Sequence, residues 1–244
     1  MKKPKKRLDA LLQERNPNLT KTFIQSMIAQ GNVTINGHIQ AKAGTQVADQ
    51  DEVILNYEQP KFVCRAGFKL EKALDEFKVD VTGLTVLDAG LSTGGFTDCL
   101  LQRGSRKVYG IDVGYGQVHE KIRADERVIV RERTNLRYLE DLGELVDLVT
   151  LDLSFISVLK VLDAVKRILK AKGKLIVLIK PQFEAERHQI GKGGIIKDPV
   201  VHEEVVQKVT KAIAAQGFTL EGVIDSPILG SSGNKEFLAY FTYL

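Results

Sequence analysis

The sequence predicts an α/β protein, in which a small α+β module precedes a Rossmann-like sheet with helices on both faces. Three observations in the 244 residues predict this class. Beyond residue 60, short apolar strands alternate with helical segments, which is typical of a parallel sheet covered on both faces. One of these strands runs directly into a glycine-rich turn and a helix. Before residue 60, two short helical segments precede Asn36-Gly37, the strongest short signal of a β-hairpin.

The first module is built from two helices and short strands. Leu8, Leu11 and Leu12 predict an amphipathic helix over 7–15 because they recur at i, i+3 and i+4. A second helix is predicted from Thr20 to Gln30, with Gly31 as its stop. The predicted strands of this module are 33–35, 38–40 and 52–55. So small a core favours a module that presents a surface rather than an independent catalytic domain.

A linker is predicted at 59–66, and the alternating part follows it. The helices predicted there are 67–77, 95–103, 116–124, 157–169 and 200–216. The predicted strands are 85–88, 107–112, 128–131, 145–152, 174–179, 220–226 and 237–242.

Composition excludes several classes of protein. With 43% hydrophobic and 27% charged residues, the chain is an ordinary globular protein rather than a disordered one. The longest uninterrupted apolar run, 175–179, is far short of the ~20 residues that a membrane span needs. Two cysteines, Cys64 and Cys99, make neither a disulfide framework nor a zinc cluster. Asp9 and Gln13 interrupt the stretch after the basic N-terminus, so we expect a cytoplasmic protein without a signal peptide, membrane contact or metal.

The net charge of +4 is unevenly distributed. Residues 1–42 hold eight Lys/Arg against two acids, whereas the other 202 residues hold 27 against 29. A basic leading segment favours a polyanion such as nucleic acid as partner, since lysines and arginines neutralise phosphates. Charge alone leaves a simple solubility role equally open.

The glycine-rich turn at 86–96 predicts a cofactor site. Its glycines allow close approach of a ligand, and the helix after it offers unpaired N–H groups. Ser92 stands where a dinucleotide fingerprint needs its second glycine, so a pyrophosphate is disfavoured. Asp112 ends the next strand, 22 residues after Gly90, where a carboxylate can accept hydrogen bonds from ribose hydroxyls. A nucleoside without pyrophosphate fits this pattern, and S-adenosylmethionine is the predicted cofactor; a purely structural turn is the alternative.

The individual roles differ along this stretch. We expect Asp88 beneath the methionine amino group and Thr134 or Asn135 against the adenine, although a loop-capping role for Asn135 is an equal alternative. The predicted cofactor-binding residues are Asp88, Gly90, Ser92, Thr93, Gly94, Gly95, Phe96, Asp112 and Asn135.

Four charged residues are predicted to meet at one edge of the sheet. Asp152 and Lys180 each end an apolar strand, Lys69 lies in the leading helix, and Glu236 opens the last strand. Two amines and two carboxylates suit deprotonation of a weakly acidic hydroxyl, because desolvation and a second ammonium lower the pKa of a lysine. Asp152 would orient Lys180, Glu236 would help to set the protonation of the network, and positioning would supply most of the catalysis. Taken singly, Lys69 is more typical of a solvated helix face and Glu236 of an edge strand.

Ordered residues in the first module carry a family resemblance. They are Arg7-Leu8-Asp9-x-x-Leu12, Ile28-x-x-Gly31-x-Val33-x-Ile35-Asn36-Gly37 and Asp51-x-Val53. This set resembles the S-four RNA-binding domain, named for ribosomal small-subunit protein four, and implies RNA as partner. That family usually opens its second helix with Ser-Arg, whereas this chain has Thr20-Lys21, which keeps a hydroxyl and a cation but changes the fork geometry.

A second resemblance covers the rest of the chain. The distinctive stretches are 65–74, 88–98, 152–157, 180–184 and 191–199. They resemble the FtsJ-like 2′-O-ribose methyltransferases, whose Lys-Asp-Lys-Glu tetrad falls on Lys69, Asp152, Lys180 and Glu236. With the first module, the chain is similar to the TlyA-type family, historically called haemolysin A and now ribosomal-RNA cytidine-2′-O-methyltransferases.

The family resemblance carries implications for organisation and partners. It implies an RNA-binding domain at 1–58, a linker at 59–66 and a methyltransferase domain at 67–244, acting on ribosomal RNA or ribosomal subunits. Cys64 and Ala66 depart from the family's Ser-Arg-Gly-Gly, which puts backbone flexibility at those two positions in doubt.

Four other functions are weighed against this one. A base N-methyltransferase would use Asp152-Leu-Ser-Phe155 as an Asp-Pro-Pro-Tyr-like motif, but both prolines are missing. A cysteine-dependent carbon methyltransferase would need a proline-cysteine motif, which Cys64 and Cys99 lack. A membrane-active haemolysin would need a span or an insertion helix. Base N-methylation would also have no use for Lys69 and Lys180. A non-catalytic RNA-binding or assembly factor would be distinguished from an enzyme by the transfer of a tritiated methyl group to ribosomal RNA.

Overall fold

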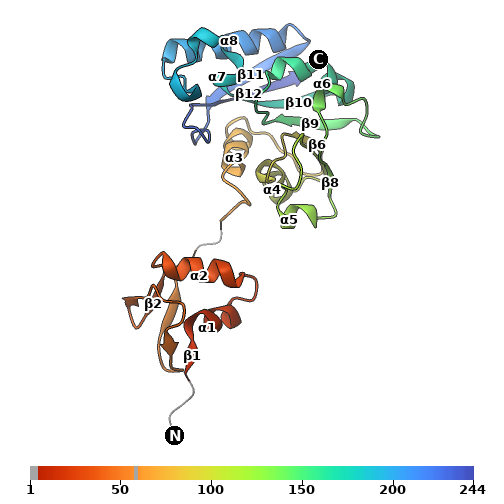
Figure 1. Ribbon diagram of the computed structural model, residues 1–244. Helices are drawn as coiled ribbons and strands as arrows, with labels where there is room; N and C mark the ends of the chain where they lie inside the picture. Colours follow the sequence, from red (N-terminus) through yellow and green to blue (C-terminus); the bar gives the residue numbers. More distant parts are fainter. Residues whose placement is uncertain (1–4, 58–59) are drawn as a thin grey trace. The chain divides into compact units, whose positions relative to one another are not determined.

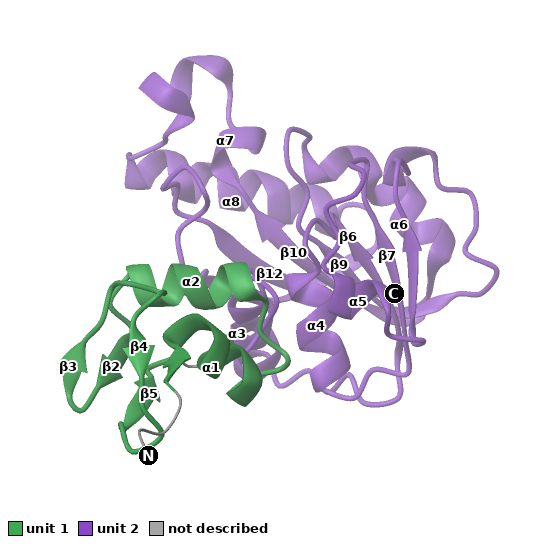
Figure 2. Cartoon of the chain, turned by 60° about the horizontal axis from the view of Figure 1, so that its bottom comes forward, with its two compact units in different colours: residues 1–60 green, residues 61–244 purple. Residues whose placement is uncertain are grey.

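The computed structural model describes residues 5–57 and 60–244, and the chain divides into two compact units, Met1–Pro60 and Lys61–Leu244 (Figure 2). The basic residues Lys2 and Lys3 and the predicted domain boundary at residues 58 and 59 lie outside the described residues. Each unit has its own hydrophobic core, so each is described by itself.

The first unit is a small α+β fold. Its elements are β1 (Lys6–Arg7), α1 (Leu8–Arg15), α2 (Lys21–Ala29), β2 (Val33–Ile35), β3 (His38–Ile39), β4 (Gln46–Val47) and β5 (Val53–Leu55). The predicted hairpin is confirmed, because β2 and β3 pair antiparallel and both Asn36 and Gly37 have positive φ, as a type I′ turn requires. Thr20 caps α2 by accepting a hydrogen bond from Phe23 N at 3.2 Å. The core of the unit is Leu8, Leu12, Ile24, Ile28, Val33 and Val47.

A buried carboxylate joins the two helices of this unit. Asp9 is fully buried and accepts hydrogen bonds from Arg7 Nη2 at 2.9 Å and from Gln25 Nε2 at 3.0 Å. The hydrogen-bonded guanidinium of Arg7 holds the pKa of Asp9 well below its usual range. Arg7 and Asp9 therefore serve the packing of this unit.

The second unit is a sheet between two layers of helices (Figure 1). The strand order is β11-β12-β10-β9-β6-β7-β8. The strands are β6 (Thr85–Ala89), β7 (Lys107–Ile111), β8 (Val128–Arg131), β9 (Val146–Leu151), β10 (Leu169–Ile179), β11 (Phe218–Asp225) and β12 (Phe237–Tyr243). The α-helices are α3 (Gly67–Glu76), α4 (Gly95–Gln102), α5 (Glu120–Arg123), α6 (Leu162–Ile168), α7 (Pro181–Glu184) and α8 (Pro199–Ala214). Four 3₁₀ turns complete the unit: η1 (Leu136–Tyr138), η2 (Val158–Val161), η3 (Arg187–Gln189) and η4 (Lys192–Gly194).

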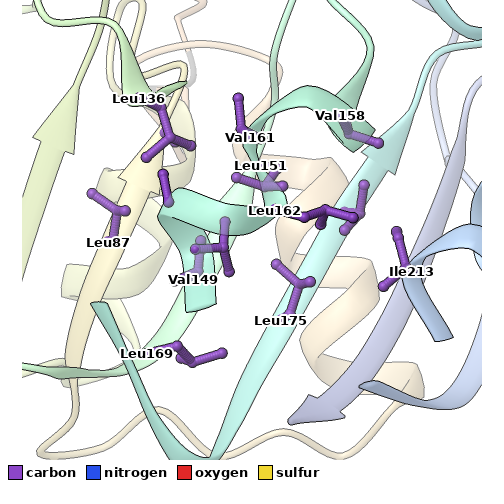
Figure 3. Close-up of a cluster of buried hydrophobic side chains, with 14 of the residues drawn as sticks. Leu87, Leu136, Val149, Leu151, Val158, Val161, Leu162, Leu169, Leu175 and Ile213 are labelled. Carbon is purple, nitrogen blue, oxygen red and sulfur yellow. The ribbon is translucent and has the colours of Figure 1, made fainter. Parts of the chain in front are cut away.

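Alternation along the strands sends neighbouring side chains into different cores. Leu87, Val149 and Leu175 face the layer that contains α6 and α8, in a hydrophobic core that also includes Leu162 and Ile213 (Figure 3). The residues that alternate with them, such as Val86, Leu148 and Ile176, face α3, α4 and α5. The predicted Rossmann-like sheet with helices on both faces is therefore confirmed.

One expectation about the sheet is corrected. The sequence predicts a parallel sheet, but β12 runs antiparallel to β10 on one side and to β11 on the other. Because β12 runs antiparallel to β10, its beginning lies at the edge where the parallel strands end, with Phe237 opposite Ile179. A strand that entered parallel would have begun at the opposite edge.

Local differences from the predicted helices have local causes. The helix predicted at 116–124 forms only as α5, since His119 caps it by accepting a hydrogen bond from Lys121 N at 3.1 Å. The helix predicted at 157–169 begins as the 3₁₀ turn η2, capped by Ser157, before α6. The short helix α7 was not predicted, although Pro181 at its first position is a typical helix start.

The second unit begins earlier than the sequence predicts. Residues 61–66, predicted as linker, pack onto this unit: Phe62 is buried under Gly67, and Val63 N donates to Asp98 Oδ2 at 2.8 Å. The Cys64 thiol packs so closely against Gly95 that a Cβ added at residue 95 would collide with the sulfur. Burial of the Phe62 ring and the hydrogen bond of Val63 N both stabilise this segment against the second unit, so it is part of that unit rather than a linker.

Candidate active site

Two of the predicted residues follow neighbouring parallel strands and meet. Asp152 follows β9, and its N–H donates to Ala89 O at 2.9 Å, which extends the ladder between β9 and β6. Lys180 follows β10, and its Nζ lies 2.6 Å from Asp152 Oδ1. The contact with Asp152 is a close ion pair without hydrogen-bond alignment; the aligned hydrogen bond of Lys180 Nζ goes to Ser154 Oγ at 2.9 Å. Both charged side chains are largely buried, with 10% and 14% of their surface exposed.

The other two predicted residues form a second pair. Lys69, in α3, donates from Nζ to Glu236 Oε2 at 2.6 Å, and both side chains are buried. Glu236 immediately precedes β12, whose Phe237 is opposite Ile179. The next positions along this antiparallel pair are Glu236 and Lys180, so the two ion pairs are neighbours.

The alternation of the strands puts these groups on one face of the sheet. Leu178 and Leu238 face the layer of α3 and α4, and Lys180 and Glu236, two residues away from each, have the same orientation. The structure thus brings together the four residues predicted for the reacting end as two buried, mutually neutralising pairs. Burial of such charges is tolerable only when they are paired, so removing one partner leaves an uncompensated charge.

A cavity of about 560 Å³ opens beside this cluster, at the carboxyl ends of β6, β7 and β9. That size suits a nucleoside-sized ligand. Four of the predicted cofactor residues line it: Gly90, Ser92, Asp112 and Asn135. Asp152 also lines the cavity, and it is therefore the link between the cavity and Lys180. Lining residues not predicted as cofactor contacts include Val113, Gly114, Gln117 and 153–156, all of which follow strand ends.

Gly90 has no room for a side chain. Its φ is +89°, and a Cβ there would lie 2.3 Å from Asp152 O. The backbone of Asp152, which follows β9, thus requires glycine at position 90, whether or not a ligand approaches this turn.

Asp112 is held rigidly at the cavity wall. Its two carboxylate oxygens accept hydrogen bonds from Ser92 N at 2.8 Å and from Gly114 N at 2.6 Å. Ser92 adopts a left-handed conformation with φ +48°, which directs its amide at this carboxylate. Each carboxylate oxygen retains further acceptor capacity, as a ligand hydroxyl would require.

Five predicted cofactor residues do not line the cavity. Asp88 is fully buried below the turn, where Thr97 Oγ1 donates to it at 2.6 Å and Thr150 Oγ1 at 3.0 Å. Its contact with a methionine amino group stays a prediction. Complete burial raises the pKa of Asp88 to about 6. The carboxyl group joins α4 to two strands.

The remaining four have structural roles in the turn. Gly94 has φ +100° and packs against Ile122, and Gly95 lies against Cys64. Thr93 accepts a hydrogen bond from His119 N through its carbonyl, and Phe96 is in the core. Gly94 and Gly95 resemble part of a ligand-binding motif because close packing and the close approach of a ligand both leave no room for a Cβ.

Asn135 has the loop-capping role that the sequence allows, and its contact with an adenine stays a prediction. Its side-chain oxygen caps η1 by accepting a hydrogen bond from Arg137 N at 3.0 Å, and the residue also lines the cavity. Thr134 lines the same cavity. Burial raises the pKa of the Cys99 thiol to about 12, which makes it a poor nucleophile and disfavours cysteine-dependent methylation.

Two further structural findings concern the described residues, 5–57 and 60–244. None of their helices combines the length and the apolar character that crossing a bilayer requires. Nor do they contain a cluster of three or more His, Cys, Asp or Glu side chains that could hold a metal ion.

Comparisons with known proteins cover nearly the whole chain. The model of the FtsJ-like methyltransferase family matches residues 62–243, and that of the S4 domain matches residues 6–53. A Bacillus subtilis protein, provisionally named rRNA methyltransferase YqxC, is 42% identical over 244 residues, covering 98% of this chain and 86% of its own length.

Two other relatives give the same picture. The 16S/23S rRNA (cytidine-2′-O)-methyltransferase TlyA of Mycobacterium tuberculosis is 40% identical over 237 residues, covering 96% of this chain and 88% of its own. A solved Streptococcus thermophilus structure, provisionally designated a hemolysin, is 40% identical with a TM-score of 0.74, covering 98% of this chain and 89% of that one.

We predict that Gly90→Ala destabilises the second unit more than Gly143→Ala does. Both glycines have φ near +90°, so both substitutions carry the cost of a left-handed alanine, about 1–2 kcal/mol. Only at Gly90 would the new Cβ meet backbone, because Gly143 has nothing within 4 Å. The collision should add about 1–3 kcal/mol, measured by urea unfolding. Equal losses for the two variants would contradict this account.

We also predict a pH-dependent difference between the wild type and Asp88→Asn. The pKa of Asp88 is raised by burial from 3.8 to about 6 in the folded protein, so the native state binds this proton more tightly than the unfolded chain does. This stabilisation is complete below pH 4 and is lost as the pH rises through 6. Relative to Asp88→Asn, the wild type should lose on the order of 3 kcal/mol over that window.

Urea unfolding at pH 4, 5, 6 and 7 measures this difference, with the exposed Asp163→Asn as the matched control. A difference between wild type and Asp88→Asn that stays constant across this range would contradict the raised pKa.

Proposed function

The chain belongs to the FtsJ-like methyltransferase family, with an S4 domain before the catalytic unit, and from this premise we propose that it methylates a ribose 2′-hydroxyl of ribosomal RNA, with S-adenosylmethionine as methyl donor. The observation that carries the proposal is the two neighbouring lysine–carboxylate pairs beside the cavity. The name of the M. tuberculosis relative supports cytidine as the nucleoside and ribosomal RNA as the substrate.

The cavity supports S-adenosylmethionine as cofactor. A fixed carboxylate, Asp112, has free acceptor capacity for ribose hydroxyls, and Thr134 and Asn135 line the same cavity near it. The turn through Gly90 and Ser92 brings backbone to the wall of the cavity. When bound, S-adenosylmethionine supplies an electrophilic methyl group on a sulfonium sulfur, which an oxygen can displace in line.

Lys180 is the residue that we assign to the 2′-hydroxyl. In its neutral form its Nζ can take the hydroxyl proton, and the resulting ammonium is balanced by Asp152 at 2.6 Å. Ser154 Oγ, which holds the same Nζ, gives the amine a second point of orientation. Because Asp152 also lines the cavity, a hydroxyl held by Lys180 lies at the boundary between the cavity and the charged cluster.

The pair of Lys69 and Glu236 completes the charge balance. Its hydrogen bond at 2.6 Å keeps a second amine and a second carboxylate next to Lys180 in a site largely closed to water. We assign to this pair the control of the electrostatic environment around Lys180. A nearby ammonium lowers the pKa of an amine and a nearby carboxylate raises it, so the two effects oppose each other.

The first unit is the proposed RNA-docking module. Lys21, at the start of α2, and Lys42 are exposed cations in it, whereas Arg7 is engaged with Asp9. Exposed cations attract the phosphate backbone without reading the bases, so we expect this unit to raise affinity more than selectivity.

Mapping of ribose methylation tests the proposed reaction. Ribosomal RNA from cells lacking the protein is incubated with the purified chain and S-adenosylmethionine, and 2′-O-methyl positions are read by resistance to alkaline cleavage. A new 2′-O-methyl site, dependent on the enzyme, is the expected result. Methyl groups confined to bases would overturn the oxygen chemistry and favour the base N-methyltransferase.

We predict that Lys180→Ala abolishes methyl transfer but leaves affinity for S-adenosylmethionine within about tenfold, or about 1.4 kcal/mol. The substitution removes the proposed base and leaves Asp152 unpaired, while Asp112 keeps its hydrogen bonds. Transfer of a tritiated methyl group and calorimetric titration measure the two effects. The exposed Lys211→Ala on α8 is the matched control. A calorimetric loss far beyond tenfold would mean that Lys180 binds the cofactor instead.

We predict that removal of residues 1–60 weakens RNA binding and reduces its dependence on salt. The second unit is compact by itself, and the FtsJ-like family match lies entirely within it, at 62–243, so this unit should fold alone. Fluorescence anisotropy with labelled RNA between 50 and 200 mM salt measures the slope, which becomes shallower when the protein neutralises fewer phosphates. An unchanged slope, in a truncated chain with native circular dichroism, would contradict RNA docking by this unit.

A further inference from the structure

One buried carboxylate near the active site has no part in the proposed reaction. Glu184 ends α7 and is only 5% exposed. It accepts hydrogen bonds from Ser157 Oγ at 2.6 Å and from Val158 N at 2.7 Å. Its own carbonyl accepts a hydrogen bond from Lys208 Nζ at 3.1 Å, which ties this end of α7 to α8.

The partners of Glu184 begin the 3₁₀ turn η2. Ser157 is its N-cap, and the Val158 amide is the first N–H of the turn, which has no partner within it. A carboxylate has acceptors only, so Glu184 can serve the hydroxyl and the amide together. Burial raises the pKa of Glu184, whereas its two donors act in the opposite direction.

Glu184 therefore joins two segments that follow neighbouring strands. One segment, 152–158, follows β9, and the other, 180–184, follows β10. The segments are joined at their beginning by Lys180 with Asp152 and Ser154, and in the middle by the rings of Phe155 and Phe183, whose centroids are 5.2 Å apart. The hydrogen bonds of Glu184 close the far end.

The turn between these joints is held in an unfavourable conformation. Phe155 has φ +65°, a left-handed conformation that is costly for a bulky residue, and the residue is 92% exposed. Burial of its own ring therefore does not explain the conformation. Such strain persists only where the surroundings over-determine the backbone, and the joints on either side of Phe155 do so.

We propose that Glu184 is a positioning residue for the methyl transfer: its carboxylate clamps segment 152–158 onto α7, so that Ser154 stays hydrogen-bonded to Lys180. This inference rests on the proposed function, in which Lys180 takes the hydroxyl proton. Without the clamp, segment 152–158 would lose both hydrogen bonds to the end of α7, and its beginning would be tied to the segment after β10 by Lys180 and by the tilted contact between the rings of Phe155 and Phe183. The ammonium of Lys180 would then lack its second point of orientation, and 153–156 would no longer form a fixed wall of the cavity.

The first experiment compares Glu184→Ala, Glu184→Gln and the exposed control Glu221→Ala. The turnover number of ribose methylation should fall about 10- to 100-fold in Glu184→Ala, the scale of a small misplacement at a reacting centre. Glu184→Gln should stay within about threefold of wild type, because its carbonyl can accept from Val158 N while its amide donates to Ser157 Oγ. Turnover of Glu184→Ala equal to that of Glu221→Ala would overturn the proposal.

The second experiment asks whether Glu184 acts through Ser154. In a double-mutant cycle, Glu184→Ala should reduce turnover by less than about twofold when Ser154→Ala is already present, because both substitutions remove the same orientation of Lys180. If the two losses multiply in full, Glu184 acts elsewhere and the proposal is wrong. Should Glu184→Ala fail to fold, as judged by circular dichroism, Glu184→Asp replaces it, since it keeps the charge but withdraws the carboxylate.

Failure of the proposed function would be seen separately. A wild-type protein that produces no 2′-O-methyl site overturns the reaction, whatever Glu184 does. Hydrogen exchange then still tests the clamp: amides of segment 152–158 should exchange at least tenfold faster in Glu184→Ala than in Glu221→Ala. Equal exchange in these two variants would overturn the clamp itself.

Discussion

Two lysines and two carboxylates are buried side by side at one edge of the sheet, and the architecture of the second unit serves that constraint. Charges removed from water are tolerable only when opposite charges meet at close range. Lys180 and Asp152 come from neighbouring parallel strands, while Lys69 and Glu236 come from a helix and from an antiparallel strand. Four distant stretches of chain must therefore be held to within hydrogen-bond distance.

Three other carboxylates, of which Asp88 and Glu184 are buried and Asp112 is partly buried, support this edge of the sheet in the same way. Asp88 accepts from two threonine hydroxyls under the glycine turn, Asp112 from two backbone amides, and Glu184 from a serine and an amide. Each carboxylate joins a strand end or helix end to another segment of the chain, and the two buried ones would be costly to bury without their donors. Together they make the rim of the cavity rigid, which suits a reaction in which orientation supplies most of the rate.

The segment that enters the second unit is part of the same packing. Asp98, in α4, accepts from Val63 N and from Lys121 Nζ, so it fixes residues 61–66 beside this helix, which follows the glycine turn. Cys64 fills the space that Gly95 leaves open. The departure of this chain from the family's serine at position 64 is thus accommodated by apolar contact.

The sequence by itself determined the fold class, the hairpin at Asn36-Gly37, the glycine turn and the placement of Asp152 and Lys180 at strand ends, because these depend on local periodicity and on residues adjacent in the chain. Tertiary structure alone decided which turn residues face the cavity, since Gly94 and Gly95 satisfy packing with the same absence of a Cβ that a ligand would require. Tertiary structure also decided the direction of β12, because strands that are distant in the sequence can pair in either direction. That antiparallel insertion puts Glu236 next to Lys180, and no local pattern encodes it.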